Sequence, residues 1–370
     1  MIAIAAVLLM QASIGNPAPA RPDGAPSFEV LSRQAAEARD TKRLAEALVL
    51  FRKALQLKPD WAEGLWEAGS IEYDQDQYKE CSADFRKLAA LKPDQAPGWT
   101  MAGLCEYHLR DYDAALKCLL QAQQLGFQQG AELARAGRLH LALVLIKLSR
   151  FENAITTLVK LTRDDNRKTP EIIVASGIAG LREPWTPPEV PESERDKVFK
   201  LGDAMTAAME QDSKEAIEKF GVVVRDYPKD ANVRFRYGAF LMQEDPQHGI
   251  QEIGKTLELQ PDHIPALVSL ANIYLKRDQA PAARQYAEKA VKLAPGDFAT
   301  HVTLGRVLRE ADDDAGAVRE FLTAVRLAPA SPESHYDLAT TYAKLGRIAD
   351  AAREREEFRR LRQVTDPNQP

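Results

Sequence analysis

Prolines recur along this chain at an almost constant interval. The recurring positions are Pro59, Pro93, Pro228, Pro261, Pro295 and Pro329. Pro59 and Pro93 are 34 residues apart. From Pro228 to Pro329 successive prolines of this set are also 34 residues apart, except for Pro228 and Pro261, which are 33 apart. Proline cannot continue a helix because it lacks the N–H and clashes with the preceding turn, and the Asp that often follows is a good cap for the next helix. The spacing therefore predicts a tandem array of helical units.

The segment from Phe298 to Pro329 is a representative unit. Gly305 lies in its first half, Phe321 lies in its second half, and the proline closes it. We expect one helical hairpin, in which small residues let the two helices approach and large residues fill the gap to the next hairpin. Such a hairpin cannot bury its own apolar face, so it needs a neighbour on each side.

The same pattern predicts nine units between residues 28 and 362. They are residues 28–59, 61–93, 95–127, 131–165, 195–228, 230–261, 264–295, 298–329 and 332–362. Three of them depart from the pattern. Residues 131–165 have no closing proline, Asp203 stands where a leucine is usual, and Asp245-Pro246 shortens the turn of its unit.

These units resemble the tetratricopeptide repeat family, whose signature is an aromatic residue, a Leu-Gly pair and a Tyr in the first helix, then Ala, an aromatic residue and Pro. The third unit carries Trp99, Gly103, Tyr107, Ala115 and Ala122 at such positions. The resemblance implies an all-α, right-handed superhelical solenoid of about nine antiparallel hairpins with one Pro-rich interruption. It also implies a concave groove, lined by the first helices, that holds a peptide or a partner helix.

By register with the family, one set of first-helix residues is predicted to line this protein-binding groove. The set is Trp66, Tyr73, Leu104, Tyr107, Leu139, Leu143, Ile146, Met205, Met209, Phe235, Met242, Leu275, Arg306 and Arg309. The lining is apolar through the middle and turns basic at the two arginines, and methionines suit an adaptable surface. The alternative is that a tight superhelix buries many of these residues against each other.

The array is interrupted once, at residues 166–194. Thr169 to Leu181 predicts an extra helix opened by Pro170. Four prolines then fall between Pro184 and Pro191, which excludes a helix or a central strand there. We expect an extended connector between an N-terminal array (28–165) and a C-terminal array (195–362). It is either a hinge or a rigid insertion packed onto both arrays.

The first twenty residues differ from the rest. Ile2 to Met10 is apolar, no charged side chain precedes Arg21, and Ala18-Pro19-Ala20 fits a cleavage site. Residues 1–20 are therefore predicted to be a cleaved export signal, which places the protein in the periplasm or outside the cell. A retained membrane anchor and a cytoplasmic leader are the alternatives. Residues 363–370 are expected to be a disordered tail.

Three cysteines bear on the compartment. Cys81 and Cys105 fall on helices of adjoining units and are candidates for a disulfide, which export would permit. The alternative is that all three cysteines, including Cys118, are simple packing residues. The formal net charge of −5 argues against a nucleic-acid partner.

No catalytic, cofactor-binding or metal-binding constellation is predicted. The sequence has no Gly-rich phosphate loop and no C-x-x-C, H-E-x-x-H or G-x-S-x-G motif. His301 and His335 occupy the same slot of successive units and are predicted to be buried packing residues, with a shared metal as the alternative. The run Asp312-Asp313-Asp314 is expected to be a solvated turn.

Taken together, these features predict a non-catalytic scaffold that binds a protein or peptide partner in its groove. We expect the protein to bind no nucleic acid and no cofactor, and to have no integral membrane span after signal removal. The alternative is an accessory or regulatory subunit that docks a catalytic chain through its convex face or through the Pro-rich connector.

Overall fold

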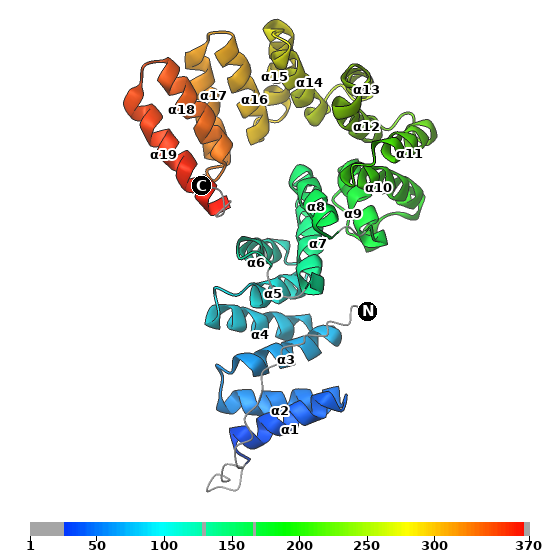
Figure 1. Ribbon diagram of the computed structural model, residues 1–370, viewed down its shortest axis with the longest axis vertical. Helices are drawn as coiled ribbons and strands as arrows, with labels where there is room; N and C mark the ends of the chain where they lie inside the picture. Colours follow the sequence, from blue (N-terminus) through cyan, green and yellow to red (C-terminus); the bar gives the residue numbers. More distant parts are fainter. Residues whose placement is uncertain (1–25, 128–130, 166–167, 366–370) are drawn as a thin grey trace. The chain divides into compact units, whose positions relative to one another are not determined.

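The computed structural model describes residues 26–127, 131–165 and 168–365. Within these ranges the chain is all-α and contains no strand (Figure 1). The predicted export signal and the last five residues lie outside the described residues. No helix in these ranges is long and apolar enough to cross a membrane.

The chain divides into two compact units, residues 1–210 and 211–370. The helices of the first unit are α1 (Phe28–Asp40), α2 (Leu44–Leu57), α3 (Ala62–Asp74), α4 (Tyr78–Leu91), α5 (Ala96–His108), α6 (Tyr112–Gln124), α7 (Ala131–Lys147), α8 (Phe151–Asp165), α9 (Pro170–Leu181) and α10 (Arg195–Met209). Two short 3-10 helices, η1 (Pro187–Glu189) and η2 (Glu192–Glu194), precede α10.

The helices of the second unit are α11 (Ser213–Asp226), α12 (Ala231–Glu244), α13 (Pro246–Leu259), α14 (Ile264–Lys276), α15 (Ala280–Leu293), α16 (Phe298–Glu310), α17 (Asp314–Leu327), α18 (Pro332–Lys344) and α19 (Ile348–Thr365). Successive helices pack as antiparallel pairs, α1 with α2 through α7 with α8, and α12 with α13 through α18 with α19. The predicted all-α fold of stacked hairpins is confirmed.

Most hairpins turn through one residue with a left-handed backbone. These residues are Lys42, Asp76, Arg110, Ser149, Asp278, Asp312 and Gly346. Only the last is a glycine, although the left-handed region is costly for other residues. The hairpin of α12 and α13 has no such residue, because Asp245 ends one helix and caps the next by accepting a hydrogen bond from His248 N at 3.2 Å. This is the shortened turn that Asp245-Pro246 predicts.

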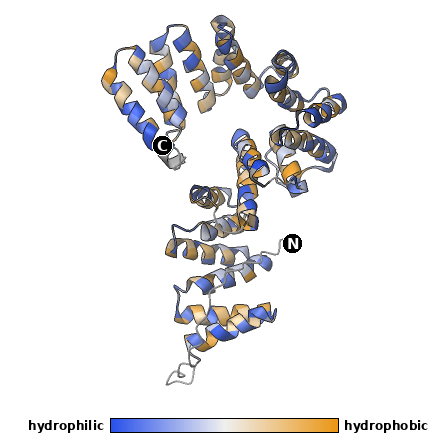
Figure 2. Cartoon of the chain, in the orientation of Figure 1, coloured by the Kyte–Doolittle hydropathy of each residue, from blue (hydrophilic) through white to orange (hydrophobic). Residues whose placement is uncertain are grey.

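The core of the hairpin of α16 and α17 joins a small residue on the first helix to a large residue on the second. A Cβ atom at Gly305 would lie 2.5 Å from the ring of Phe321, so only glycine leaves room for that ring. The ring also belongs to a cluster that includes Leu338 of the next hairpin. Phe321 therefore closes its own hairpin and contributes to the packing between hairpins. Figure 2 shows hydrophobic and hydrophilic residues mixed along the helices, as expected where each helix buries one face.

The predicted extra helix is present as α9, and it packs against α10. A Cβ atom at Gly177 would lie 1.8 Å from the carbonyl oxygen of Val198, and one at Gly202 would lie 1.8 Å from that of Ile173. The two glycines thus bring the two backbones into direct contact. We predicted that the chain divides at residues 166–194, whereas the compact units divide at Glu210 and Gln211, after α10, because α10 shares its packing with α9.

The Pro-rich connector belongs to the first unit. Thr186 and Val190 are buried. Glu189 accepts a hydrogen bond from Lys147 of α7 at 2.6 Å, and this contact lowers the pKa of its carboxyl to about 2. These contacts favour the packed insertion over the hinge, because a hinge would have to break them.

Candidate functional site

Six of the predicted groove residues are buried rather than open to a partner. They are Leu104, Leu143, Ile146, Met205, Met209 and Phe235, each between 0% and 6% exposed. A side chain with so little exposed surface is a packing residue, as the alternative of a tight superhelix expected. The groove prediction therefore rests on the part-exposed members, which are Trp66, Tyr73, Tyr107, Leu139, Met242, Leu275, Arg306 and Arg309.

Two of the part-exposed residues, Tyr73 and Tyr107, belong to a run of rings in the first unit, whereas Trp66 packs edge-on against the buried Phe85. Trp66 and Tyr73 lie two turns apart on α3, and Tyr107 occupies on α5 the position that Tyr73 occupies on α3. Another tyrosine follows each of these two tyrosines five residues later, at the start of the next helix: Tyr78 begins α4 and Tyr112 begins α6. We call the side chains of Tyr73, Tyr78, Tyr107, His108 and Tyr112 the ring face.

The rings of this face contact one another. Tyr78 and His108 are stacked, with ring centroids 4.3 Å apart and planes within 9°. The hydroxyl of Tyr73 lies 3.3 Å from Nε2 of His108. The Tyr73 ring packs edge-on against the rings of Tyr78 and His108. Contacts of 5.5 Å between Tyr107 and His108 and of 5.9 Å between Tyr107 and Tyr112 continue the row. The ring face is therefore a connected, preformed surface.

The row ends on α7 at a buried histidine. His140 packs edge-on against Tyr107 with centroids 5.0 Å apart, and its Nδ1 lies 2.8 Å from the carbonyl oxygen of Ala136. Burial lowers the pKa of His140 to about 4. The imidazole is consequently neutral at physiological pH, so its Nδ1 carries the proton that the carbonyl accepts.

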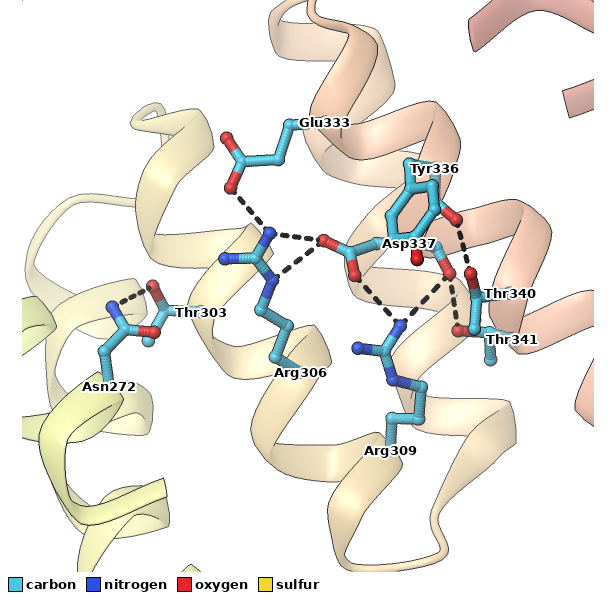
Figure 3. A network of polar contacts seen from close by, with 9 residues as sticks. All are labelled: Asn272, Thr303, Arg306, Arg309, Glu333, Tyr336, Asp337, Thr340 and Thr341. Carbon is cyan, nitrogen blue, oxygen red and sulfur yellow. Dashed lines mark hydrogen bonds and ion pairs between the residues drawn. The ribbon is translucent and has the colours of Figure 1, made fainter. Parts of the chain in front are cut away.

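The second unit has a polar first-helix face instead. Figure 3 shows Arg306 and Arg309 of α16 converging on Asp337 of α18, at 2.8 Å and 2.9 Å. Arg306 also reaches Glu333 at 2.6 Å. We expected the groove to turn basic here, but two carboxylates balance the two guanidinium groups. On the neighbouring helix, Asn272 donates a hydrogen bond to the Thr303 hydroxyl at 3.3 Å.

Three buried carboxylates in the first unit, those of Glu72, Asp84 and Glu106, were not predicted from the sequence. Glu72 and Glu106 occupy the same slot of successive repeats, and they pair with Arg52 and Arg86, which also share a slot. Glu72 and Asp84 share Arg52, and both are buried. The regular 34-residue spacing of these pairs is a signal in the sequence, but burial of the acidic partner is visible only in the structure.

Cys81 of α4 and Cys105 of α5 form a disulfide, so these two cysteines are bonded and do not simply pack. Cys118 stays a thiol, and burial together with the nearby Glu106 raises its pKa to about 12. A thiol in this state is a poor nucleophile. The cysteines therefore offer covalent stabilisation rather than thiol chemistry.

His301 and His335 are buried, as predicted. His301 lies 2.6 Å from Glu320 through Nδ1 and 3.0 Å from the Pro295 carbonyl through Nε2, and His335 repeats this arrangement with Glu354 and Pro329. Both nitrogens of each ring are thus occupied within the chain. No group of three potential metal ligands occurs among the described residues. At the Asp312–Asp314 turn, Lys344 binds Asp312 at 2.8 Å and Asp314 at 3.2 Å.

Comparison with known families decides the identity of the repeats. Residues 264–297 and residues 302–357 each match the tetratricopeptide repeat family. The chain is a tetratricopeptide repeat protein. Proteins of this family are protein-interaction scaffolds that bind protein partners, and they are generally non-catalytic.

Two solved structures illustrate the similarity of this tetratricopeptide repeat protein to others. The structure of MamA residues 41-end from Desulfovibrio magneticus RS-1 is 21% identical, with a TM-score of 0.41, over 45% of this chain and 96% of that one. Another MamA crystal structure is 16% identical, with a TM-score of 0.40, over 44% of this chain and 95% of that one. No curated protein matches the sequence.

Proposed function

We propose that this tetratricopeptide repeat protein is an exported, non-catalytic scaffold that binds an extended segment of a partner protein on its ring face. The observation that carries the proposal is the connected row of rings from Tyr73 to Tyr112. Tyrosine and tryptophan supply large contact area at a small cost in conformational entropy, and they are enriched at the centres of interfaces.

The proposal for binding is tested by capture of partners from the cell envelope, identified by mass spectrometry. The double variant Tyr73→Ala and Tyr107→Ala should lose the partner while helical circular dichroism stays unchanged. Leu91→Ala is the matched control, because Leu91 is 42% exposed and ends α4, thirteen residues after Tyr78 and thus about 20 Å along the helix. Equal capture by the double variant and the control would refute the ring-face assignment.

Export is supported by the covalent bond between Cys81 and Cys105, because disulfides persist in oxidising compartments and are rare in the cytosol. Fractionation of cells that produce the chain, followed by sequencing of the mature N-terminus, tests this part. Mature protein in the envelope fraction that lacks residues 1–20 is the expected result. Recovery from the cytosol with Met1 in place would contradict export.

The alternative role, docking of a catalytic chain through the Pro-rich connector, has less support. Thr186 and Val190 are buried, and Glu189 is already bound to Lys147. A docking segment would have to release these contacts, so the ring face is the stronger candidate.

A further inference from the structure

One end of the ring face has an uncompensated negative charge. We call Tyr73, Tyr78 and His108, together with Asp74 and Asp76, the first corner. Asp76 accepts a hydrogen bond from the Tyr78 hydroxyl, and Asp74 ends α3 beside Tyr73. Among the described residues, no lysine or arginine forms an ion pair with either carboxylate.

The electrostatic effects on the titratable groups agree with this charge count. Burial, without an opposing cation, raises the pKa of Asp74. Burial and then the two aspartates raise the pKa of Tyr73 to about 12. Burial lowers the pKa of His108, so the imidazole stacked on Tyr78 is neutral at physiological pH. The first corner thus carries two carboxylates and no cation.

The next corner along the ring face shows what the same chemistry accommodates. There, the ammonium of Lys147 lies 5.8 Å from the centroid of Tyr112 and 2.6 Å from Glu189. A cation is held between a tyrosine ring and a carboxylate, both supplied by the chain itself. Tyr112 is the counterpart of Tyr78 one repeat later, so the first corner offers the ring and the carboxylates without the cation.

We propose that the first corner binds an arginine side chain of the partner segment. The proposal rests on the ring face being the binding surface. A guanidinium is planar and stacks on aromatic rings, and its donors form a fork that two nearby carboxylate groups can accept. Lysine carries a positive charge but has no planar group to stack on the rings. A neutral side chain would leave the charges of Asp74 and Asp76 uncompensated. Arginine therefore fits both the rings and the carboxylates.

The test uses the full chain and a defined probe, the acetylated amide of Gly-Arg-Gly. Tyrosine ring resonances are followed by nuclear magnetic resonance during titration, with the citrulline peptide as the neutral analogue of the same shape. We expect saturable shifts of Tyr73 and Tyr78, an affinity at least tenfold higher than for the citrulline peptide, and weakening by salt. Tyr336, which is 54% exposed in the second unit, reports non-specific binding.

Variants make the result specific. Asp74→Asn with Asp76→Asn should reduce the affinity at least tenfold, and Asn at position 76 can still accept from the Tyr78 hydroxyl, so the corner keeps its shape. Asp94→Asn, at another exposed aspartate that has no ion-pair partner within the described ranges, should bind as the parent does. Equal affinity for the citrulline peptide, no effect of the double variant, or equal shifts of Tyr336 would each overturn the proposal.

The outcome is independent of the capture experiment. A chain that binds the arginine peptide but captures no envelope partner would remove the proposed scaffold role and leave the first corner in place. A chain that captures a partner equally well after Asp74→Asn and Asp76→Asn would keep the scaffold role and remove the arginine site.

Discussion

Arg52 of α2 donates a hydrogen bond to Asp84 of α4 at 2.9 Å, and the same guanidinium also binds Glu72 of α3. Glu72 is 1% exposed and Asp84 is 6% exposed. Two buried carboxylates therefore share one cation, and no described residue forms a hydrogen bond with Glu72 Oε2 or Asp84 Oδ2. Glu80 adds negative charge near Glu72, and Lys87 adds positive charge near Asp84. Burial raises the pKa of Glu72 from 4.5 to about 7, and burial also raises the pKa of Asp84.

This arrangement predicts a stability that falls as pH rises. Between pH 4.5 and 7 the folded state holds a proton on Glu72 that the unfolded state has released, so each rise in pH favours unfolding. Glu72→Gln removes this dependence. Between pH 5 and pH 8, the stability of the variant relative to the parent should increase by roughly 2–3 kcal/mol, measured by urea unfolding.

Glu106→Gln is the control for that prediction. Glu106 occupies the same slot one repeat later, but Arg86 there forms an ion pair with only this one carboxylate among the described residues. Its replacement removes one partner of a balanced pair and should lower stability at both pH values. A Glu72→Gln variant that follows the pH dependence of the parent would contradict our account of the shared arginine.

The contact between α9 and α10 predicts strong intolerance of a methyl group. Gly177→Ala should destabilise the first unit by about 3 kcal/mol or more, because the new Cβ would meet the Val198 carbonyl oxygen on a rigid backbone. Gly221→Ala in α11 is the matched control. Nothing lies within 4 Å of a Cβ there, and Ala is the better helix former by about 1 kcal/mol. Scanning calorimetry compares the two, and equal effects would exclude the close contact.

The left-handed turns predict a stabilising substitution. Arg110 has a φ of 63° between α5 and α6 and is exposed. Arg110→Gly should relieve the strain of a side chain in this region and raise stability by about 0.5–1 kcal/mol, although glycine also makes the unfolded chain more flexible. Lys53→Gly in the middle of α2 should lower stability by a similar amount, because no strain is relieved there. Thermal unfolding measures the expected increase in stability for Arg110→Gly and the expected decrease for Lys53→Gly.

The disulfide predicts a thiol count and a stability loss. Denatured but unreduced protein should show one reactive thiol, that of Cys118, and three after reduction. The double variant Cys81→Ser and Cys105→Ser should lose about 2–4 kcal/mol, because the bond between α4 and α5 closes a loop in the unfolded chain. Three thiols before reduction would show that the cysteines only pack together.

By itself, the sequence determined the repeating unit. The period of the prolines, the small residue at Gly305 and the large one at Phe321 specify helical hairpins, because helix termination and close packing are local requirements that each repeat satisfies with its own residues. The buried slots of His301 and His335 follow from the same register. The aromatic members of the ring face could be listed from it as well, since Tyr73 and Tyr107 recur at the repeat spacing.

Only the tertiary structure decided which of the listed residues are exposed. Leu104 and Phe235 fit the groove register but are buried, since exposure depends on how closely the neighbouring helix packs. The neutralisation of Arg306 and Arg309 by Glu333 and Asp337 depends on a helix one repeat later. Likewise, the pairing of α9 with α10 through Gly177 and Gly202 and the sharing of Arg52 by two carboxylates arise from contacts between helices, which a repeat spacing does not encode.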